Sequence, residues 1–321
     1  MSAGALNVAG FDAAGFDAAG FNAAQWLVDR HVAAGRGGAV AFHCGDEEVT
    51  YAGLQRSVWA TGRGLQSLGV GPGDRVMMVV DDEPAFPATF LAGLRIGAIP
   101  IPVSTMLRPA ELAVLAADSQ ARVVVLSDRY AACLAELMVG TAVTDAVLTG
   151  PGSASGSGVV SAGAIAVHRW SAFDDATEPA AAATDRSTPG FWLYTSGTTG
   201  KPKGAIHRHG DLEAICTTYA RTVLDIRATD VCYSVPKLFF AFGLGNSLVF
   251  PLSVGAGAVL DPDPPAPTRA AALLARHRPT LFFAPPGFCA AMADVGLPPD
   301  ALSSARATVT AGEVLPAEVQ R

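Results

Sequence analysis

The sequence has few cysteines and no cluster of basic residues, and these shortages exclude several classes of protein. Its five cysteines are odd in number and widely scattered, and they form no Cys-x-x-Cys pair, which argues against a disulfide framework and against a zinc site. The formal net charge of −7 and the lack of clustered Lys and Arg argue against a nucleic-acid partner, because binding a phosphate backbone requires such clusters. Small anionic ligands stay compatible with this composition.

Long uninterrupted hydrophobic runs are also missing. The N-terminus has no basic segment leading into an apolar run, so no secretory signal is expected. The most membrane-like window, residues 85–103, contains Arg95 and several prolines, which fits a helix, a turn and a buried strand better than a membrane span. We therefore expect a cytoplasmic protein with reduced cysteines and no membrane partner.

Hydrophobic residues make up 50% of the 321 positions, which is enough to bury a large core and to form more than one lobe. Residues 9–23 repeat a five-residue unit, AGFDA-AGFDA-AGFNA, whose period matches neither a helix nor a strand. We expect residues 1–21 to be a weakly ordered leader and the compact structure to begin at residue 22.

Apolar runs typical of buried strands alternate with helical stretches along the rest of the chain. Strands are expected at residues 75–80, 98–103, 121–127, 190–194, 205–209, 230–235, 256–260, 279–285 and 305–312. This pattern predicts an α/β fold with parallel strands. The Gly- and Ser-rich residues 149–158 are expected to form a surface loop.

The segment YTSGTTGKPKG, residues 194–204, has the composition of a phosphate-binding loop between two strands. Its glycines let backbone N–H groups approach an anion, its hydroxyls add donors, and Lys201 and Lys203 add positive charge. A P-loop NTPase is excluded, because Pro202 follows Lys201 and because Gly197 and Gly200 are too close together. The alternative is a mobile polar hairpin loop without a ligand.

This eleven-residue segment resembles the signature phosphate loop of the adenylate-forming superfamily, which includes acyl-CoA synthetases, peptide adenylation domains and luciferases. Further segments are similar to the benzoate-CoA ligase branch: HRHGDL, residues 236–260, HRPTLFFAPPGFCAAM and TAGEVLP. The resemblance covers nearly the whole chain after the leader. It implies a large N-terminal domain with two packed, mainly parallel sheet subdomains, which we place at residues 22–185 and 186–321.

The resemblance implies that ATP, with Mg²⁺, activates an aromatic carboxylic acid to an acyl-adenylate, and that coenzyme A then accepts the acyl group. Donors that hold the leaving pyrophosphate would lower the barrier to this reaction. By resemblance the ATP phosphates are held by Thr195, Ser196, Gly197, Thr198, Thr199, Gly200 and Lys201. Lys203 fits an exposed loop surface equally well.

The resemblance also implies an acyl pocket. Its residues are Phe240, Ala241, Phe242, Gly243, Ala311 and Gly312. Phe240 stands where many relatives have a gating His, and Phe242 where benzoate-CoA ligases usually have Tyr. The alternatives are a buried helix start around residue 240 and a simple strand-to-helix turn before Glu313. His207 and His209 lack a third ligand nearby, so we assign no metal site.

Further motifs of the family are expected beyond Arg321: the adenine and magnesium segment, the ribose-binding Asp, the hinge and the C-terminal domain with its catalytic Lys. We therefore expect an N-terminal fragment that is inactive alone, and we assign no catalytic residue. The alternatives are a stand-alone aryl-adenylating enzyme that loads a carrier protein, and a non-catalytic binding or assembly protein. The oligomeric state is left open, with a homodimer among the options.

Overall fold

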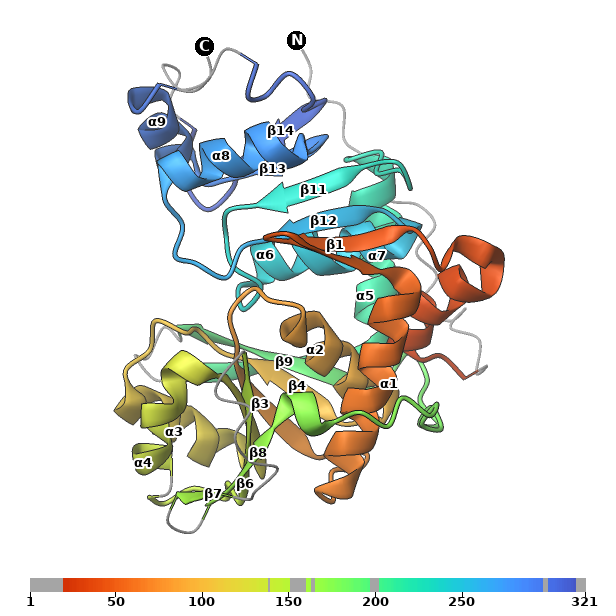
Figure 1. Ribbon diagram of the computed structural model, residues 1–321, viewed down its shortest axis with the longest axis vertical. Coiled ribbons are helices and arrows are strands. Elements are labelled where there is room, and N and C mark those ends of the chain that lie inside the picture. The colour runs from red at the N-terminus through yellow and green to blue at the C-terminus, as the bar shows by residue number, and fades with distance from the viewer. Residues whose placement is uncertain are drawn as a thin grey trace, which may run out of the picture.

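The computed structural model describes residues 20–137, 139–150, 160–162, 165–196, 202–296 and 300–315. Two six-stranded sheets lie one above the other, with helices between them and on both outer faces (Figure 1). Residues 1–19 of the expected leader lie outside the described residues. Phe21 is buried, and its N–H donates to the carbonyl oxygen of Thr184 at 2.8 Å.

One sheet, here called the β3 sheet, has the strand order β4-β3-β5-β6-β8-β7. Its strands are β3 (Arg75–Val79), β4 (Ile99–Pro102), β5 (Val123–Ser127), β6 (Asp145–Thr149), β7 (Val160–Ala162) and β8 (Ile165–Arg169). Neighbouring strands are parallel except for β7 and β8. The mainly parallel arrangement expected from the sequence is confirmed for this half of the fold.

The second sheet, here called the β11 sheet, has the order β14-β13-β11-β12-β1-β2. Its strands are β1 (Val40–Cys44), β2 (Glu47–Thr50), β11 (Val231–Ser234), β12 (Gly257–Leu260), β13 (Leu281–Phe283) and β14 (Ala307–Val309). The β1–β2 hairpin is antiparallel, and β1 pairs in parallel with β12, so that Phe42 lies opposite Ala258. The division into two subdomains at residue 185 stays a prediction. Strands β1 and β2 come before residue 185 in the sequence, yet they belong to the sheet whose other strands come after it.

A separate antiparallel hairpin carries the two ends of the expected phosphate loop. Its strands are β9 (Pro189–Ser196) and β10 (Pro202–Arg208), with Ser196 opposite Pro202. Strand β9 runs beside β4 of the β3 sheet (Figure 1).

The helices are α1 (Tyr51–Ser67), α2 (Ala85–Arg95), α3 (Pro109–Ser119), α4 (Leu134–Leu137), α5 (His209–Ile215), α6 (Ala241–Leu244), α7 (Phe250–Val254), α8 (Pro267–His277) and α9 (Pro286–Asp294). Short helical segments cover Gln25–Asp29, Val32–Arg36, Asp128–Cys133, Trp170–Ala172, Cys216–Ala220 and Gly245–Val249. Within the described ranges, no helix combines the length and apolar character that a bilayer crossing requires.

The buried side chains form three clusters that explain the layers. Val76 and Met78 of β3 belong to the cluster between the sheets, whereas Met77 and Val79 belong to the cluster with α3 and α4. This alternation follows from the two-residue period of a strand that is covered on both faces. A third cluster joins the outer face of the β11 sheet to α8 and α9.

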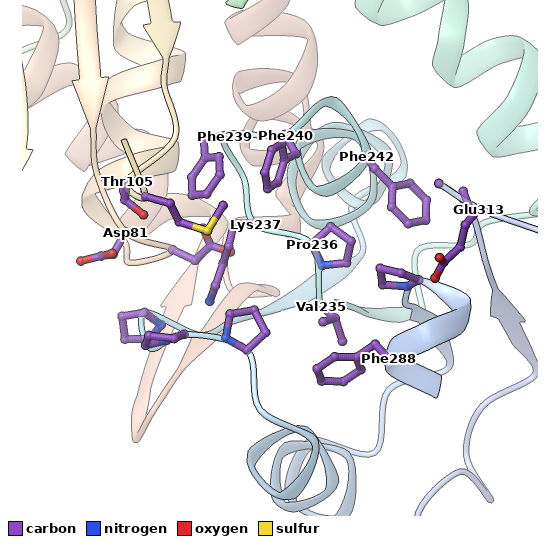
Figure 2. Close-up of a pocket in the computed structure, with 18 of the residues that line it drawn as sticks. Asp81, Thr105, Val235, Pro236, Lys237, Phe239, Phe240, Phe242, Phe288 and Glu313 are labelled. Atoms are coloured by element: carbon purple, nitrogen blue, oxygen red, sulfur yellow. The ribbon is translucent and has the colours of Figure 1, made fainter. Parts of the chain in front are cut away.

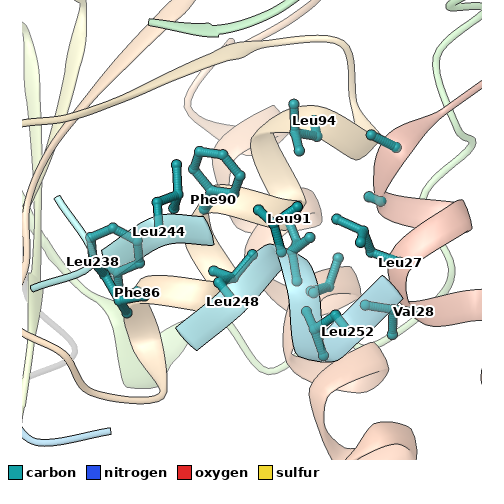
Figure 3. Packing of buried hydrophobic residues seen from close by; sticks show 14 of the residues in the cluster. Leu27, Val28, Phe86, Phe90, Leu91, Leu94, Leu238, Leu244, Leu248 and Leu252 are labelled. Atoms are coloured by element: carbon teal, nitrogen blue, oxygen red, sulfur yellow. The ribbon is translucent and has the colours of Figure 1, made fainter. Parts of the chain in front are cut away.

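The middle layer joins the two sheets (Figure 3). Phe86, Phe90 and Leu91 of α2 pack in one cluster with Leu248 and Leu252, which lie near the β11 sheet. Full burial of a Leu or Phe side chain stabilises a fold by about 1.5–3 kcal/mol. This layer therefore holds the strand ends of both sheets in fixed positions relative to each other.

Candidate functional site

A cavity of about 780 Å³ lies where the carboxyl ends of strands from both sheets meet (Figure 2). The β3 sheet contributes residues that follow β3, β4 and β5, and the β11 sheet contributes residues that follow β11, β12, β13 and β14. This edge is where open α/β sheets commonly bind ligands. Its lining includes Asp81, Asp82, Thr105, Arg129, Tyr130, Val235, Pro236, Lys237, Phe239, Phe240, Phe242, Pro285, Phe288, Ala311, Gly312 and Glu313.

One end of the cavity is apolar. Figure 2 shows Phe242 beside Glu313, and Phe288 beside Val235. The Phe242 ring also meets Phe283 edge to face, with 6.4 Å between ring centroids and 87° between ring planes. Flat aromatic and proline surfaces of this kind can pack against an apolar ligand.

Four of the six predicted acyl-pocket residues line the cavity: Phe240, Phe242, Ala311 and Gly312. Phe240 is 44% exposed and lies against Phe239, with 4.6 Å between the ring centroids. Gly312 has φ +98°, a conformation that favours glycine. The part that these residues play in substrate binding stays a prediction.

Ala241 and Gly243 are not among the residues that line the cavity. Ala241 is exposed, and it is the first residue of α6. Gly243 is buried, and a Cβ added there would lie 2.1 Å from the Lys237 carbonyl oxygen. Gly243 therefore lets α6 pack closely against the backbone of Pro236 and Lys237, two residues that line the cavity.

Glu313 has a definite partner. Its Oε1 accepts the N–H of Gly287 at 2.7 Å, in the first turn of α9. A carboxylate is favourable at a helix N-terminus because the free N–H groups and the helix dipole are positive there. The sequence suggested this role for Glu313 toward a following helix, whereas the observed contact is with the preceding helix α9.

The other end of the cavity is polar, and the sequence analysis missed it. Asp81 Oδ2 pairs with Arg129 Nε at 2.9 Å, and Asp81 Oδ1 accepts the Tyr130 hydroxyl at 2.9 Å. Lys237 Nζ donates to the carbonyl oxygens of Asp261 and Asp263, the latter at 2.6 Å. Asp81 and Asp82 directly follow the strand expected at residues 75–80. Because ligands commonly bind at the carboxyl ends of parallel strands, their position was a signal for a site.

Asp82 is a buried carboxyl group of the site. Its side chain is 5% exposed, and its Oδ1 accepts the Leu238 N–H at 3.0 Å. Burial raises the pKa of Asp82 to about 7, although the Lys237 ammonium and the Leu238 N–H act in the opposite direction. A carboxyl group of this kind is half protonated near neutral pH.

The predicted phosphate loop is described only at its start. Thr195 is exposed near the end of β9, Ser196 ends that strand, and Gly197, Thr198, Thr199, Gly200 and Lys201 lie outside the described residues. Lys203 is exposed on β10, opposite Thr195. A second cavity of about 250 Å³ lies between Thr195 and Pro202 on one side and Phe239 and Phe240 on the other.

These two cavities share Phe239 and Phe240. The hairpin that carries the loop is therefore a neighbour of the aromatic wall formed by Phe239 and Phe240.

The two histidines of the hairpin region do not converge on a common site. His207 stacks on Phe191, with ring centroids 4.7 Å apart and planes at 10°. His209 is fully buried and its Nδ1 accepts the Ala23 N–H at 3.1 Å, and burial lowers the pKa of His209 to about 4. Across the described part of the chain, no group of three or more His, Cys, Asp or Glu residues is placed to hold a metal ion.

Comparison with known proteins extends these observations. The family model described as "AMP-binding enzyme" matches residues 29–321. The chain is 38% identical to a benzoate–CoA ligase of Thauera aromatica over 92% of the chain and 54% of that protein. It is 35% identical to a 4-hydroxybenzoate–CoA/benzoate–CoA ligase of Rhodopseudomonas palustris, over 91% of the chain and 53% of that protein.

A solved structure of a benzoate CoA ligase from Burkholderia xenovorans has a TM-score of 0.82 and 33% identity, over 93% of this chain and 57% of that one. The chain thus spans about half the length of the relatives that it matches. The likeness extends over nearly all of this chain and includes both sheets. The chain belongs to the AMP-binding enzyme family, whose members are also called adenylate-forming enzymes.

Proposed function

We propose that the complete protein is an AMP-forming acid–thiol ligase that activates an aromatic carboxylic acid with ATP and transfers the acyl group to coenzyme A in the cytoplasm. The observation that carries this proposal is the apolar cavity beside the hairpin that bears the phosphate-loop motif. Relatives named as benzoate–CoA ligases support it. The activity is proposed for the complete protein, and inactivity of residues 1–321 alone stays a prediction.

The proposed chemistry begins with a carboxylate oxygen of the acid, which attacks the α-phosphorus of ATP. A carbon–oxygen–phosphorus link forms, the bond from the α-phosphorus to the bridging oxygen breaks, and pyrophosphate leaves. The backbone and hydroxyl donors of the 195–201 loop would hold the β- and γ-phosphates as negative charge moves onto pyrophosphate. Mg²⁺ would enter the site with ATP.

The ring of the acid would lie at the apolar end of the cavity. Val235, Phe242 and Phe288 present no hydrogen-bonding side-chain group to a ligand there. A hydroxyl or amino substituent directed at these side chains would lose its water without gaining a partner, at a cost of about 1–3 kcal/mol. Benzoates with apolar ring substituents are therefore the favoured substrates.

One relative is named for the formation of the adenylate alone. The chain is 32% identical to a p-hydroxybenzoic acid–AMP ligase of Mycobacterium marinum over 90% of the chain and 38% of that protein. The variant proposal is an enzyme that forms the same aryl-adenylate and passes it to a carrier protein.

The product of the complete coding sequence should release pyrophosphate when ATP and benzoate are both present. The assay compares benzoate, methyl-, chloro-, hydroxy- and aminobenzoates with hexanoate and octanoate. Aryl-CoA formed on addition of coenzyme A identifies the ligase, and pyrophosphate release without aryl-CoA favours the carrier-protein variant. A preference for the aliphatic acids would reject the aromatic assignment, and release with no acid would reject acid activation altogether.

A further inference from the structure

The Asp82–Leu238 hydrogen bond joins the two sheets at the cavity, across 156 positions of sequence. Asp82 lies just after β3 in the β3 sheet, and Leu238 lies just after β11 in the other sheet. Both residues are buried, with 5% of Asp82 and 0% of Leu238 exposed. The contact is thus a direct polar link between the strand ends that form opposite sides of the candidate site.

Leu238 is held on its apolar side as well. Its side chain belongs to the buried cluster that contains Phe86 of α2 and Leu244 of α6 (Figure 3). The side chain and the N–H of one residue are therefore fixed by different partners. This double attachment sets both the position and the orientation of the backbone at residue 238.

The turn before Leu238 has its own attachments. The Lys237 ammonium binds the carbonyl oxygens of Asp261 and Asp263, and the Lys237 carbonyl oxygen accepts the Phe240 N–H at 3.0 Å. Gly243 packs against the carbonyl oxygens of Pro236 and Lys237 from the other side. These contacts all lie within the β11 half of the fold, whereas the contact of Leu238 reaches the β3 sheet.

Phe239 and Phe240 follow Leu238 directly, and they line both cavities. Any rotation of the backbone at Leu238 would therefore move two aromatic rings of the wall. A displacement of about 1 Å at a binding wall can change a rate by about 10²-fold. The backbone at residue 238 is a sensitive point for the shape of the acid site.

We propose that Asp82 is a positioning residue, which fixes the aromatic wall at Phe239 and Phe240 by accepting the N–H of Leu238 from the opposite sheet. This inference rests on the proposed function only for the identity of the ligand. The property that matters is the acceptor oxygen at this position. A neutral side chain that keeps an oxygen there should therefore preserve the wall, and one without it should not.

The test compares Asp82→Asn with Asp82→Ala in the product of the complete coding sequence. Asp82→Ala should raise KM for benzoate by about tenfold or more, with KM for ATP changed less than about twofold. Asp82→Asn keeps an acceptor and should leave KM for benzoate within about threefold of wild type. Equal KM for benzoate in Asp82→Ala and wild type, or equal losses in the two variants, would overturn the proposal.

Asp230→Ala is the control for loss of stability, and it also removes the acceptor of Thr280 and the ion-pair partner of Arg306. Asp230 is also buried, at 4% exposed, and its Oδ2 accepts the backbone N–H of Arg227 at 2.8 Å, but it does not line the cavity. This variant should unfold more easily and keep KM for benzoate within about twofold. A rise in KM equal to that of Asp82→Ala would show that general destabilisation explains both.

Amide hydrogen exchange keeps the proposal testable if Asp82→Ala does not fold. The Leu238 amide should be protected in wild type and in Asp82→Asn, because both retain the acceptor. Rapid exchange in wild type would overturn the proposal, and this measurement requires no substrate. A wild-type protein that activates no aromatic acid would reject the proposed function, while the exchange result would still decide whether Asp82 fixes the wall.

Discussion

Gly243 and Lys237 are packed so closely that a Cβ on Gly243 would lie 2.1 Å from the Lys237 carbonyl oxygen. No side chain fits between α6 and the turn that precedes the aromatic wall. Gly243, which was predicted to line the acyl pocket, thus makes a close contact between two backbone segments and does not line the cavity.

Gly243→Ala should push the 236–237 turn away from α6. We expect the free energy of unfolding to fall by about 1–3 kcal/mol or more, as for other overpacked cores, and benzoate binding to weaken. Urea denaturation and benzoate titration measure the two effects. Gly38→Ala is the control, because a Cβ on Gly38 meets no atom within 4 Å. Wild-type stability in Gly243→Ala would show that this turn adapts without cost.

Phe242→Tyr should shift the preference among ring-substituted benzoates toward those with a hydroxyl group. The new phenol would give a polar substituent a partner at the apolar end of the cavity, worth about 1–3 kcal/mol, or about 5- to 150-fold in relative kcat/KM. The measurement is kcat/KM for hydroxybenzoates divided by that for methylbenzoates. An unchanged ratio would place Phe242 outside the ring site.

Asp82 should make the stability of the protein depend on pH between about 4 and 7. Its pKa is raised from 3.8 to about 7 in the folded state, so the folded state binds this proton more tightly than the unfolded state does. The contribution of Asp82 to stability is therefore greatest below about pH 4 and is lost as the pH rises to about 7, by about 4 kcal/mol in all. The charged groups that act on Asp82 are Lys237, which lowers its pKa, and Asp81 and Asp261, which raise it.

Urea denaturation of wild type and Asp82→Asn at pH 5 and pH 8 isolates this effect. The variant should lose less stability than wild type between these two values, because Asn does not titrate. Parallel losses in the two proteins would mean that Asp82 stays ionised throughout.

Lys201 and Lys203 should differ in importance, although both belong to the same motif. Lys201→Ala should lower kcat for adenylate formation by about 10²-fold or more, as expected for loss of one charge that stabilises the transition state. Lys203→Ala should have an effect below about threefold, because Lys203 is exposed on β10. Pyrophosphate release measures both, and equal effects would contradict the proposed phosphate contact of Lys201.

Much of the fold follows from local patterns in the sequence. The strands at 75–80, 121–127 and 256–260 are confirmed as β3, β5 and β12, because buried parallel strands appear as short apolar runs. The helix expected after β5 is only partly present, as a short helical segment, Asp128–Cys133, and the one-turn α4. The β1–β2 hairpin was not predicted, because its place in the β11 sheet depends on pairing with β12, far along the chain.

The candidate site shows the same limit. The loop at 194–204 is recognisable because its donors are consecutive, and Phe242 because it belongs to a similar segment in a known family. Asp82 and Lys237 were missed, because their partners Leu238, Asp261 and Asp263 are defined by packing between strand ends. Long-range contacts of this type leave no periodic signal in the sequence.

The pairing of Phe42 with Ala258 also means that β1 must wait for a strand that is synthesised much later. Strand β1 leaves the ribosome early, but its parallel neighbour β12 is made much later, after tens of seconds at about 5–20 residues per second. During this interval the edge of β1 that will face β12 has no partner, and an unpaired strand edge can join other chains. Newly made protein should therefore be most prone to aggregate before β12 emerges, and holding β1 apart during that time would be a task for a chaperone.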